Sequence, residues 1–325
     1  MESAPYFLFT SFRGGGEDGL YLALSRDGFR WVSLTQGRPW ATCEALQTTL
    51  LRDPCLTLGP DGLFHLVFTR GSDEHGPVLG YARSADLLTW THTRIIPVMR
   101  EFAGARNAWA PEVFWDEAQK NYLLLWASTV EGRFVPIPRE PGREGFDHRI
   151  FATRTQDWET FTPTVELFDP GHSATAPTIV APQSTGESFR LVFKDDRWEP
   201  RQKCLRFAEA DKPDGPYRNV SAPITGEGAD GPSSLVVGEW TYIYYERTVH
   251  DRERPSTPVG YGAIRTRDWQ TWEDVSARMA FPTGHRQGTA LEIDLTVARP
   301  LLWSSGVTLE APAVRAVVRA PLPNC

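Results

Sequence analysis

The chain has 325 residues, of which 41% are hydrophobic and 23% charged, enough for one large domain or two ordinary ones. Its formal net charge is −7 and no basic cluster stands out, which argues against nucleic acid and anionic membranes as partners. No apolar run approaches the roughly 20 residues that a membrane-spanning helix needs. The 12 Trp and 17 Phe, with 27 Gly and 26 Pro, are typical of an all-β protein with many turns.

The N-terminus and the cysteines favour an intracellular, reduced setting. The opening MESAPYFLFTSF has neither the basic nor the long apolar segment of a signal peptide. Cys43, Cys55, Cys204 and Cys325 lie far apart, without the spacing of a zinc site or a disulfide scaffold. We therefore expect a cytoplasmic protein without a bound metal ion, and the oligomeric state stays open.

One short signature recurs along the chain and predicts its architecture. Ser or Thr, any residue and Asp are followed by an aromatic residue in SRDGFRW, SADLLTW, TQDWETF and TRDWQTW, whose aspartates are Asp27, Asp86, Asp157 and Asp268. A weaker copy, EADKPDGPY, contains Asp211. Five copies spaced 54–71 residues apart indicate a stacked or radial repeat. We expect each Asp to bond backbone N–H groups in a turn.

The segments between these copies have the composition and alternation of short strands. In chain order, strands are expected at 5–12, 53–58, 62–68, 78–83, 90–96, 111–116, 120–127, 149–154, 161–167, 177–182, 188–194, 203–208, 217–220, 231–237, 239–245, 259–265 and 272–276. Four strands per repeat and five repeats predict an all-β, five-bladed β-propeller. The first repeat lacks its leading strand. We expect GTALEID at 288–294 to supply it, so that strands from both ends of the chain pair and close the ring.

The propeller is expected to occupy residues 1–299 as one domain. Residues 300–325 fall outside the five repeats, and we expect them to add a strand or two packed on its outside. Residues 130–148 have the composition of an insertion loop. Together with the 248–258 loop, this insertion is expected to wall one side of a small pocket.

The leading strand of each blade lines the central channel of a propeller, so the residues at the starts of these strands converge. Taken at one position per repeat, they are Asp53, Glu112, Ala176, Asp230 and Gln287. Three of the five are carboxylates beside Pro or Gly, where the chain turns into the strand. Like charges brought together raise at least one pKa, as in pairs that divide acid and base roles. We expect these three acids to share one hollow.

Several segments together resemble glycoside hydrolase family 43 and its relatives. They are RDPCL, NAWAPEVFWD, KNYLLLWAS, HRIFATRTQDWETF, LVFKDD and GADGPSSL. The segment FRGGGEDGL at 12–20 is similar to the opening of a narrower family-43-like group. The resemblance covers residues 5–294 and implies a five-bladed propeller that hydrolyses arabinofuranosides or xylosides with inversion, without an organic cofactor.

The resemblance also implies roles for individual residues. Inversion needs one carboxyl group to activate water and another to protonate the leaving oxygen, about 6.5–9.5 Å apart. Asp53 of RDP matches the family's general base, and Asp230 of ADGP falls where the family has a glutamic acid. The family's third Asp, which adjusts the acid, corresponds to Ala176. Its ring-closing His, which often holds a water or calcium ion, corresponds to Gln287, so we expect no required calcium.

These departures leave the acid open between two residues. Asp230 is one methylene shorter than Glu, which sets a proton donor back by about an ångström, outside easy reach of the leaving oxygen. Glu112 is the alternative, because related invertase-like propellers use an RDP aspartate and a glutamate on the next blade. The Asn-Asp-Pro nucleophile of those enzymes has no clear counterpart here. The acidic pair Glu17 and Asp18 is the weaker candidate.

Polar and aromatic residues beside the strand entrances are the expected sugar contacts, because such groups bind ring hydroxyls or stack on sugar faces. They are Arg52, Arg106, Asn107, Trp109, His148, Arg149, Lys194, Asp195, Glu246 and Gln287, with Glu17 and Asp18.

The sequence thus predicts a glycosidase of the family-43 kind, exo-acting and inverting, that takes a small carbohydrate. Two alternatives remain open. One is a carbohydrate-binding propeller that has lost its catalytic acids. The other is an enzyme of the same fold with retaining, fructoside-type or transferase chemistry.

Overall fold

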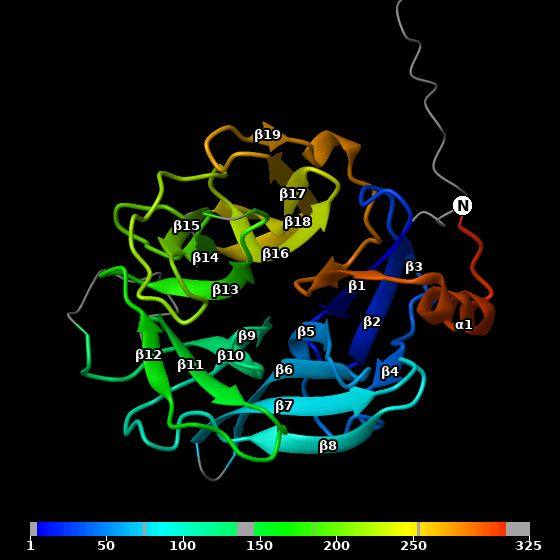
Figure 1. Ribbon diagram of the computed structural model, residues 1–325, viewed down its shortest axis with the longest axis horizontal. Helices are drawn as coiled ribbons and strands as arrows, with labels where there is room; N and C mark the ends of the chain where they lie inside the picture. The colour runs from blue at the N-terminus through cyan, green and yellow to red at the C-terminus, as the bar shows by residue number, and fades with distance from the viewer. Residues whose placement is uncertain (1–4, 74–75, 135–145, 185, 252–253, 310–325) are drawn as a thin grey trace, which may run out of the picture.

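A computed structural model describes residues 5–73, 76–134, 146–184, 186–251 and 254–309. Five small antiparallel sheets surround a common centre, each with one strand nearest the axis (Figure 1). This arrangement is a five-bladed β-propeller, as the repeat predicts. No helix in the described part of the chain is long and apolar enough to cross a bilayer.

The first blade contains strands from both ends of the propeller. Its sheet comprises β1 (Tyr6–Arg13), β2 (Gly19–Ser25), β3 (Val32–Ser33), β4 (Ala41–Thr42), β20 (His285–Arg286) and β21 (Ala290–Ile293). β21 pairs with β1 in antiparallel register, with Tyr6 opposite Ile293 and Phe9 opposite Ala290. The predicted ring closure by GTALEID is therefore confirmed.

The other four blades follow in chain order. Blade II comprises β5 (Arg52–Leu58), β6 (Phe64–Asp73), β7 (Gly76–Ser84) and β8 (Thr91–Ile96). Blade III comprises β9 (Trp109–Asp116), β10 (Asn121–Ser128), β11 (Arg149–Thr155) and β12 (Val165–Phe168). Blade IV comprises β13 (Ala174–Val180), β14 (Phe189–Asp195) and β15 (Cys204–Ala210). Blade V comprises β16 (Ala229–Val237), β17 (Trp240–Asp251), β18 (Arg254–Thr266) and β19 (Glu273–Asp274). A single helical turn, η1 (Ser276–Arg278), follows.

Hydrophobic side chains pack between the blades. Each of five buried clusters joins two neighbouring blades; Leu8 and Leu66, for example, lie in the cluster between blades I and II. The innermost strands contact one another around the ring, so β5 lies between β1 and β9, and β16 lies between β13 and β21. Polar residues at the starts of these strands are thereby held near the axis.

The repeated aspartates form the expected turns. Asp86 Oδ1 accepts hydrogen bonds from the backbone N–H groups of Leu88 and Thr89, both at 2.8 Å. The same pair of bonds is made by Asp27, Asp157 and Asp268. The weaker copy differs, because Asp211 instead pairs with Arg218 at 2.8 Å.

Three expectations about elements are corrected. The predicted strand at 217–220 is reduced to one backbone pairing between Glu209 and Arg218, because Asn219 has a positive φ of 56° that a strand does not accommodate. The 248–258 region belongs to the long hairpin of β17 and β18, and 252–253 lie outside the described residues. In place of an appended strand, α1 (Leu295–Ser305) begins after Asp294, whose side chain accepts from the N–H of Val297.

α1 packs on the cluster between blades I and II through Ala298 and Leu301. Residues 310–325, and residues 135–145 of the expected insertion, lie outside the described residues.

Candidate active site

The same β-bulge opens the inner strand of four blades. In each, one residue of the inner strand pairs with the second strand, and the next two residues are unpaired. Pairing then resumes two residues along the second strand, so that two residues of the inner strand face one of its neighbour. The skipped residues are Asp53-Pro54, Ala110-Pro111, Ala176-Pro177 and Gly231-Pro232. The first residue of each pair has a positive φ, of 49°, 50°, 50° and 54° respectively. This left-handed conformation is strained for Asp and Ala.

The bulge corrects the expectation that Asp53, Glu112 and Asp230 occupy equivalent positions. Asp53 is the first skipped residue of its bulge, Glu112 lies two residues further into the strand, and Asp230 lies one residue before the skipped pair. The three acids therefore stand at successive depths along the axis. The proline shared by all four bulges is the sequence signal that marks this register.

Asp53 is buried and held by one hydrogen bond. Thr69 Oγ1, on β6, donates to its Oδ2 at 2.8 Å and accepts from the backbone N–H of Ala110 at 2.9 Å, so it joins blades II and III. The other carboxylate oxygen, Oδ1, is buried and has no hydrogen-bond partner among the described residues. A buried carboxylate oxygen without a protein donor is free to accept a hydrogen bond from a water or a ligand.

Glu112 stands two residues further along its strand, lines the axial cavity and is part-buried. Thr178 Oγ1, on β13, donates to its Oε1 at 2.7 Å. Burial raises the pKa of Glu112 to about 7, although hydrogen bonds from Thr178 and Cys55 lower it. Glu112 therefore holds a proton in much of the protein at neutral pH.

Asp53 and Glu112 line one small axial cavity. Its volume is about 30 Å³, and Ala176, Gln287 and Thr289 also contribute to its wall. That space suits one water molecule. A sugar ring does not fit in this space. Asp230 does not line this cavity, but the next residue, Gly231, does.

Asp230 forms an ion pair at the entrance of blade V. Lys194 Nζ lies 2.7 Å from its Oδ2, and its Oδ1 accepts from the N–H of Gly231 at 2.8 Å. Lys194 also contacts Asp196 at 3.0 Å, and Asp196 contacts Lys203 at 2.8 Å. These alternating charges stabilise the ionised form of Asp230.

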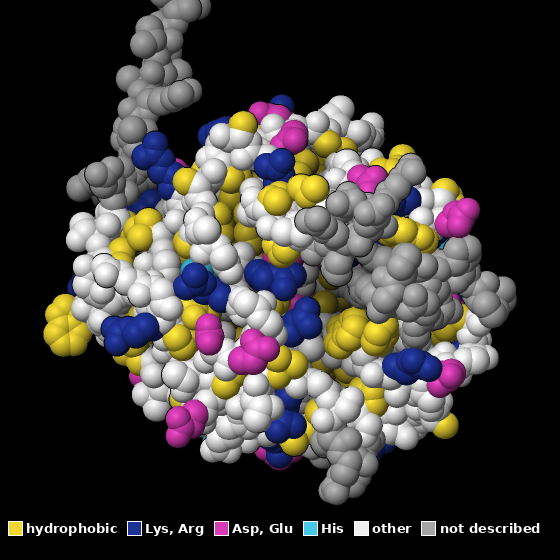
Figure 2. All heavy atoms as spheres, turned by 180° about the vertical axis from the view of Figure 1, so that it is seen from behind, with side chains coloured by type: hydrophobic (Ala, Val, Ile, Leu, Met, Phe, Trp, Pro, Cys, Tyr) yellow, Lys and Arg dark blue, Asp and Glu magenta, His cyan; other side chains and the backbone are white. Residues whose placement is uncertain are grey.

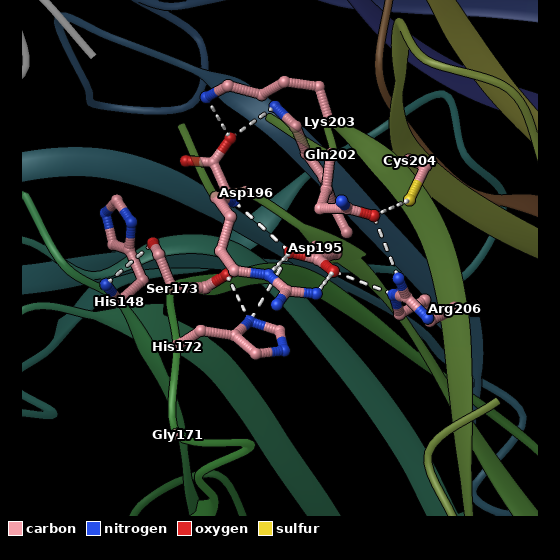
Figure 3. Close-up of polar contacts among 12 residues, drawn as sticks. His148, Gly171, His172, Ser173, Asp195, Asp196, Gln202, Lys203, Cys204 and Arg206 are labelled. Atoms are coloured by element: carbon pink, nitrogen blue, oxygen red, sulfur yellow. Dashed lines mark hydrogen bonds and ion pairs between the residues drawn. The ribbon is translucent and has the colours of Figure 1, made fainter. Parts of the chain in front are cut away.

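Asp195 and Asp196 are consecutive residues with separate partners, as Figure 3 shows. Asp196 forms an ion pair with Lys203. Asp195 accepts hydrogen bonds from Arg206 at 2.8 Å and from two nitrogens of Arg197 at 2.9 and 2.5 Å. Asp195 therefore supports the turn between β14 and β15.

A second charged group stands beside Asp230. Glu246 is 1% exposed and binds Arg286 through both carboxylate oxygens, at 2.9 and 3.2 Å, while Gln287 Nε2 donates to it at 3.2 Å. Burial raises the pKa of Glu246, and Arg286 opposes the rise. Arg286 and Arg52 both lie over the ring of Phe12. Lys and Arg side chains gather near the centre of the face in Figure 2.

Aromatic rings border the entrance of blade III. The ring of Trp109 lies 4.6 Å from that of Phe146 and 5.2 Å from that of His148, measured between centroids. Trp109 is half-buried, whereas His148 is fully buried. Phe146 is part-exposed as well, so Trp109 and Phe146 are the rings of this group that can offer a face to a ligand.

Comparison with known proteins defines the family. A family model described as “Probable glycosyl hydrolase domain”, of the glycosyl hydrolase 43-related kind, matches residues 4–296. The chain belongs to this glycosyl hydrolase family. It is accordingly a glycosidase, and no curated protein matched its sequence.

Solved structures share the fold of this glycosyl hydrolase at low sequence identity. A thermostable family-43 glycoside hydrolase aligns with a TM-score of 0.62 at 14% identity, over 88% of this chain and 94% of its own. A xylan β-1,4-xylosidase from Bacillus halodurans aligns at 0.59 and 15%, over 90% and 56%. An exo-β-1,3-galactanase from Phanerochaete chrysosporium aligns at 0.59 and 14%, over 86% and 62%.

Other residues expected to contact sugar have protein partners in this glycosyl hydrolase. Asn107 donates to the carbonyl of Ala127 and accepts from the N–H of Thr129. Arg149 pairs with Asp147 and Asp169.

Three further expected contacts lie on the surface. Arg106 pairs with Glu131 at 3.1 Å, and the exposed Asp18 accepts from Tyr21. Glu17 is also exposed. Their roles in binding remain predictions.

Two residues that the sequence analysis omitted belong to the site. Thr69 fixes Asp53, and Arg286 anchors Glu246. Thr69, Lys194 and Glu246 occupy the same place in their blades, opposite the last paired residue before the bulge. Aligning the ends of the second strands of the blades, as was done for the inner strands, would therefore have identified Thr69. Among the described residues, no three His, Cys, Asp or Glu side chains group as a metal site requires.

Proposed function

We propose that this glycosidase hydrolyses a terminal arabinofuranoside or xyloside with inversion, with Asp53 as general base and Asp230 as general acid. The observation that carries the proposal is the environment of Asp53, whose Oδ2 is fixed by Thr69 while its buried Oδ1 has no partner among the described residues. A carboxylate oriented in this way can accept a proton from an attacking water.

The position of Asp230 supports its role opposite Asp53. Their strands, β16 and β5, belong to blades that are separated by blade I (Figure 1). Two carboxyl groups on blades that are not neighbours lie farther apart than two on adjacent blades. An inverting mechanism needs such a wide distance between its carboxyl groups, because a water must fit between one of them and the sugar. Gln287 lines the axial cavity, and Arg52 and Trp109 are the first residues of β5 and β9. We propose these three as the donors and the ring face for a sugar.

The ion pair with Lys194 sets a condition on this mechanism. An ammonium 2.7 Å away keeps Asp230 charged, whereas a general acid must carry a proton. Lys194 already contacts Asp196 at 3.0 Å. We infer that a bound sugar separates Lys194 from Asp230, and that Lys194 then remains with Asp196.

The test compares Asp53→Asn, Asp230→Asn and Glu112→Gln on aryl arabinofuranosides, xylosides and galactosides. We expect Asp53→Asn to lose at least 10³-fold in kcat/KM on every substrate, a loss typical of removing an acid–base group. Asp230→Asn should lose as much on alkyl glycosides but little on glycosyl fluorides, whose leaving group needs no proton. Asp211→Asn, on the exposed rim of blade IV, is the matched control.

The anomeric configuration of the first product, followed by NMR, tests inversion. Full activity of Asp53→Asn would remove the proposed base. Selective rescue of Glu112→Gln by fluoride substrates, with Asp230→Asn unaffected on all substrates, would transfer the acid role to Glu112.

A further inference from the structure

A row of alternating charges leads from Asp230 into the interior of blade IV. Lys194 Nζ lies 2.7 Å from Asp230 Oδ2 and 3.0 Å from Asp196 Oδ1. Lys203 Nζ lies 2.8 Å from the same oxygen of Asp196 (Figure 3). The Asp230 side chain is 21% exposed, whereas those of Lys194, Asp196 and Lys203 are 5%, 7% and 1% exposed. Substrate therefore has access to the Asp230 end of this row.

The two lysines share one carboxylate oxygen. Lys194 has a choice of two carboxylates, Asp230 on one side and Asp196 on the other. Because the two ammonium groups repel each other, Asp196 holds Lys194 less tightly than it would without Lys203. Lys203 therefore leaves Lys194 closer to Asp230, and Asp196 acts in the opposite sense.

The backbone fixes Lys203 relative to Asp230. The carbonyl oxygen of Lys203 accepts hydrogen bonds from the N–H groups of Gly228 and Ala229, at 2.8 and 3.2 Å, directly before Asp230. The same residue thus anchors the start of β16 with its carbonyl group and binds Asp196 with its ammonium group. The distance over which the row acts on Asp230 is therefore built into the fold.

We propose that Asp196 and Lys203 are positioning residues that set how readily Asp230 carries a proton, by competing over the ammonium group of Lys194. Asp196 draws Lys194 away and favours the protonated acid, whereas Lys203 opposes Asp196. Both side chains are buried and act on Asp230 through Lys194. This inference rests on the proposed role of Asp230 as general acid.

Other titratable groups surround Asp230. Those from further strands are Glu246 on β17, Tyr261 on β18, Arg286 on β20 and Asp53 on β5. Burial raises the pKa of the Tyr261 hydroxyl well above its usual value, so this group stays neutral. All four are retained when Asp196 or Lys203 is replaced. A difference between such variants therefore reports on the row of charges alone.

The pH dependence of kcat on an alkyl pentoside tests the proposal, because its leaving group needs a proton and kcat reports the acid in the enzyme–substrate complex. The rate should fall as pH rises through the pKa of Asp230. Asp196→Asn leaves Lys194 with Asp230, so we expect this fall about one pH unit lower than in the wild type. Lys203→Met strengthens the hold of Asp196 on Lys194, and the fall should move up by about half a unit.

Two further measurements separate this role from a structural one. Pentosyl fluorides need no general acid, so neither substitution should move their pH profile. The double variant Asp196→Asn/Lys203→Met should resemble Asp196→Asn, because Lys203 acts through Asp196. The pH at which kcat falls does not depend on how much of a variant is folded, so a destabilised variant still gives a clear result.

Asp211→Asn and Lys120→Met are the controls, since they make the same substitutions in exposed ion pairs and should keep the wild-type profile. The inference is overturned if the two single variants shift the fall in the same direction or leave it in place. Equal shifts on the fluorides would overturn it too. Wild-type activity of Asp230→Asn on alkyl pentosides defeats the proposed acid itself, a result that the Asp196 and Lys203 variants cannot mimic.

Discussion

At the scale of single residues, the burial of Glu112 links the stability of the protein to pH. Its pKa is about 7 in the folded protein and near 4.5 in an unfolded chain. The folded state therefore binds one more proton between these values, so this contribution is fully present below pH 4.5 and is lost as pH rises through 7. A shift of this size corresponds to about 3 kcal/mol.

Urea unfolding at several pH values checks this prediction. The difference in unfolding free energy between wild type and Glu112→Gln should change by about 3 kcal/mol between pH 4.5 and 8, with the wild type losing stability relative to the variant. Glu117→Gln serves as the exposed control. A constant difference across this range would show that Glu112 ionises as it does in water.

The residues of the site were predictable from sequence to different extents. Asp53 could be placed because the RDP segment precedes an obvious strand. The relative depths of Glu112 and Asp230 were missed because the acids were aligned by the starts of the strands, whereas a bulge shifts side chains by one or two positions; aligning the bulge prolines would have given the register. The partners of Asp230 depend on packing between blades, which the local sequence does not record.

At the scale of elements, the aspartate turns should each contribute measurably to stability. Asp86→Ala removes the acceptor of two backbone hydrogen bonds that open β8. We expect a loss of about 1–2 kcal/mol in the free energy of unfolding, as for other local hydrogen bonds. Asp211→Ala is the matched control, because Asp211 makes an exposed ion pair instead. Equal losses in both variants would contradict the turn role.

Strands were predicted well because their alternating and aromatic patterns are local. α1 was not predicted, since Pro300 and the β-branched residues Thr296 and Val297 disfavour a helix in isolation. Its stability comes from the Asp294 cap and from burial of Leu301 against the propeller. The outer strand of blade IV was overpredicted, because the left-handed conformation of Asn219 that ends it is not visible in the strand-like pattern of the segment.

At the scale of the whole molecule, Gly288 controls ring closure. A Cβ there would lie 1.9 Å from the carbonyl oxygen of Thr10, on the neighbouring strand β1. Gly288→Ala must push the closing segment away from β1, and we expect it to cost about 2–3 kcal/mol, as overpacking does elsewhere. Thermal and urea unfolding measure this loss. Gly226→Ala, where no atom lies within 4 Å of the added carbon, should be near neutral.

The pairing of β21 with β1 also has a consequence for synthesis on the ribosome. Phe9 emerges first, but its partner Ala290 follows 281 residues later. At about 5–20 residues per second, the inner edge of β1 stays open for roughly 15–60 s. The blade that is translated first is therefore the last to be completed. Nascent chains stalled before residue 290 should expose a strand edge that the released protein covers.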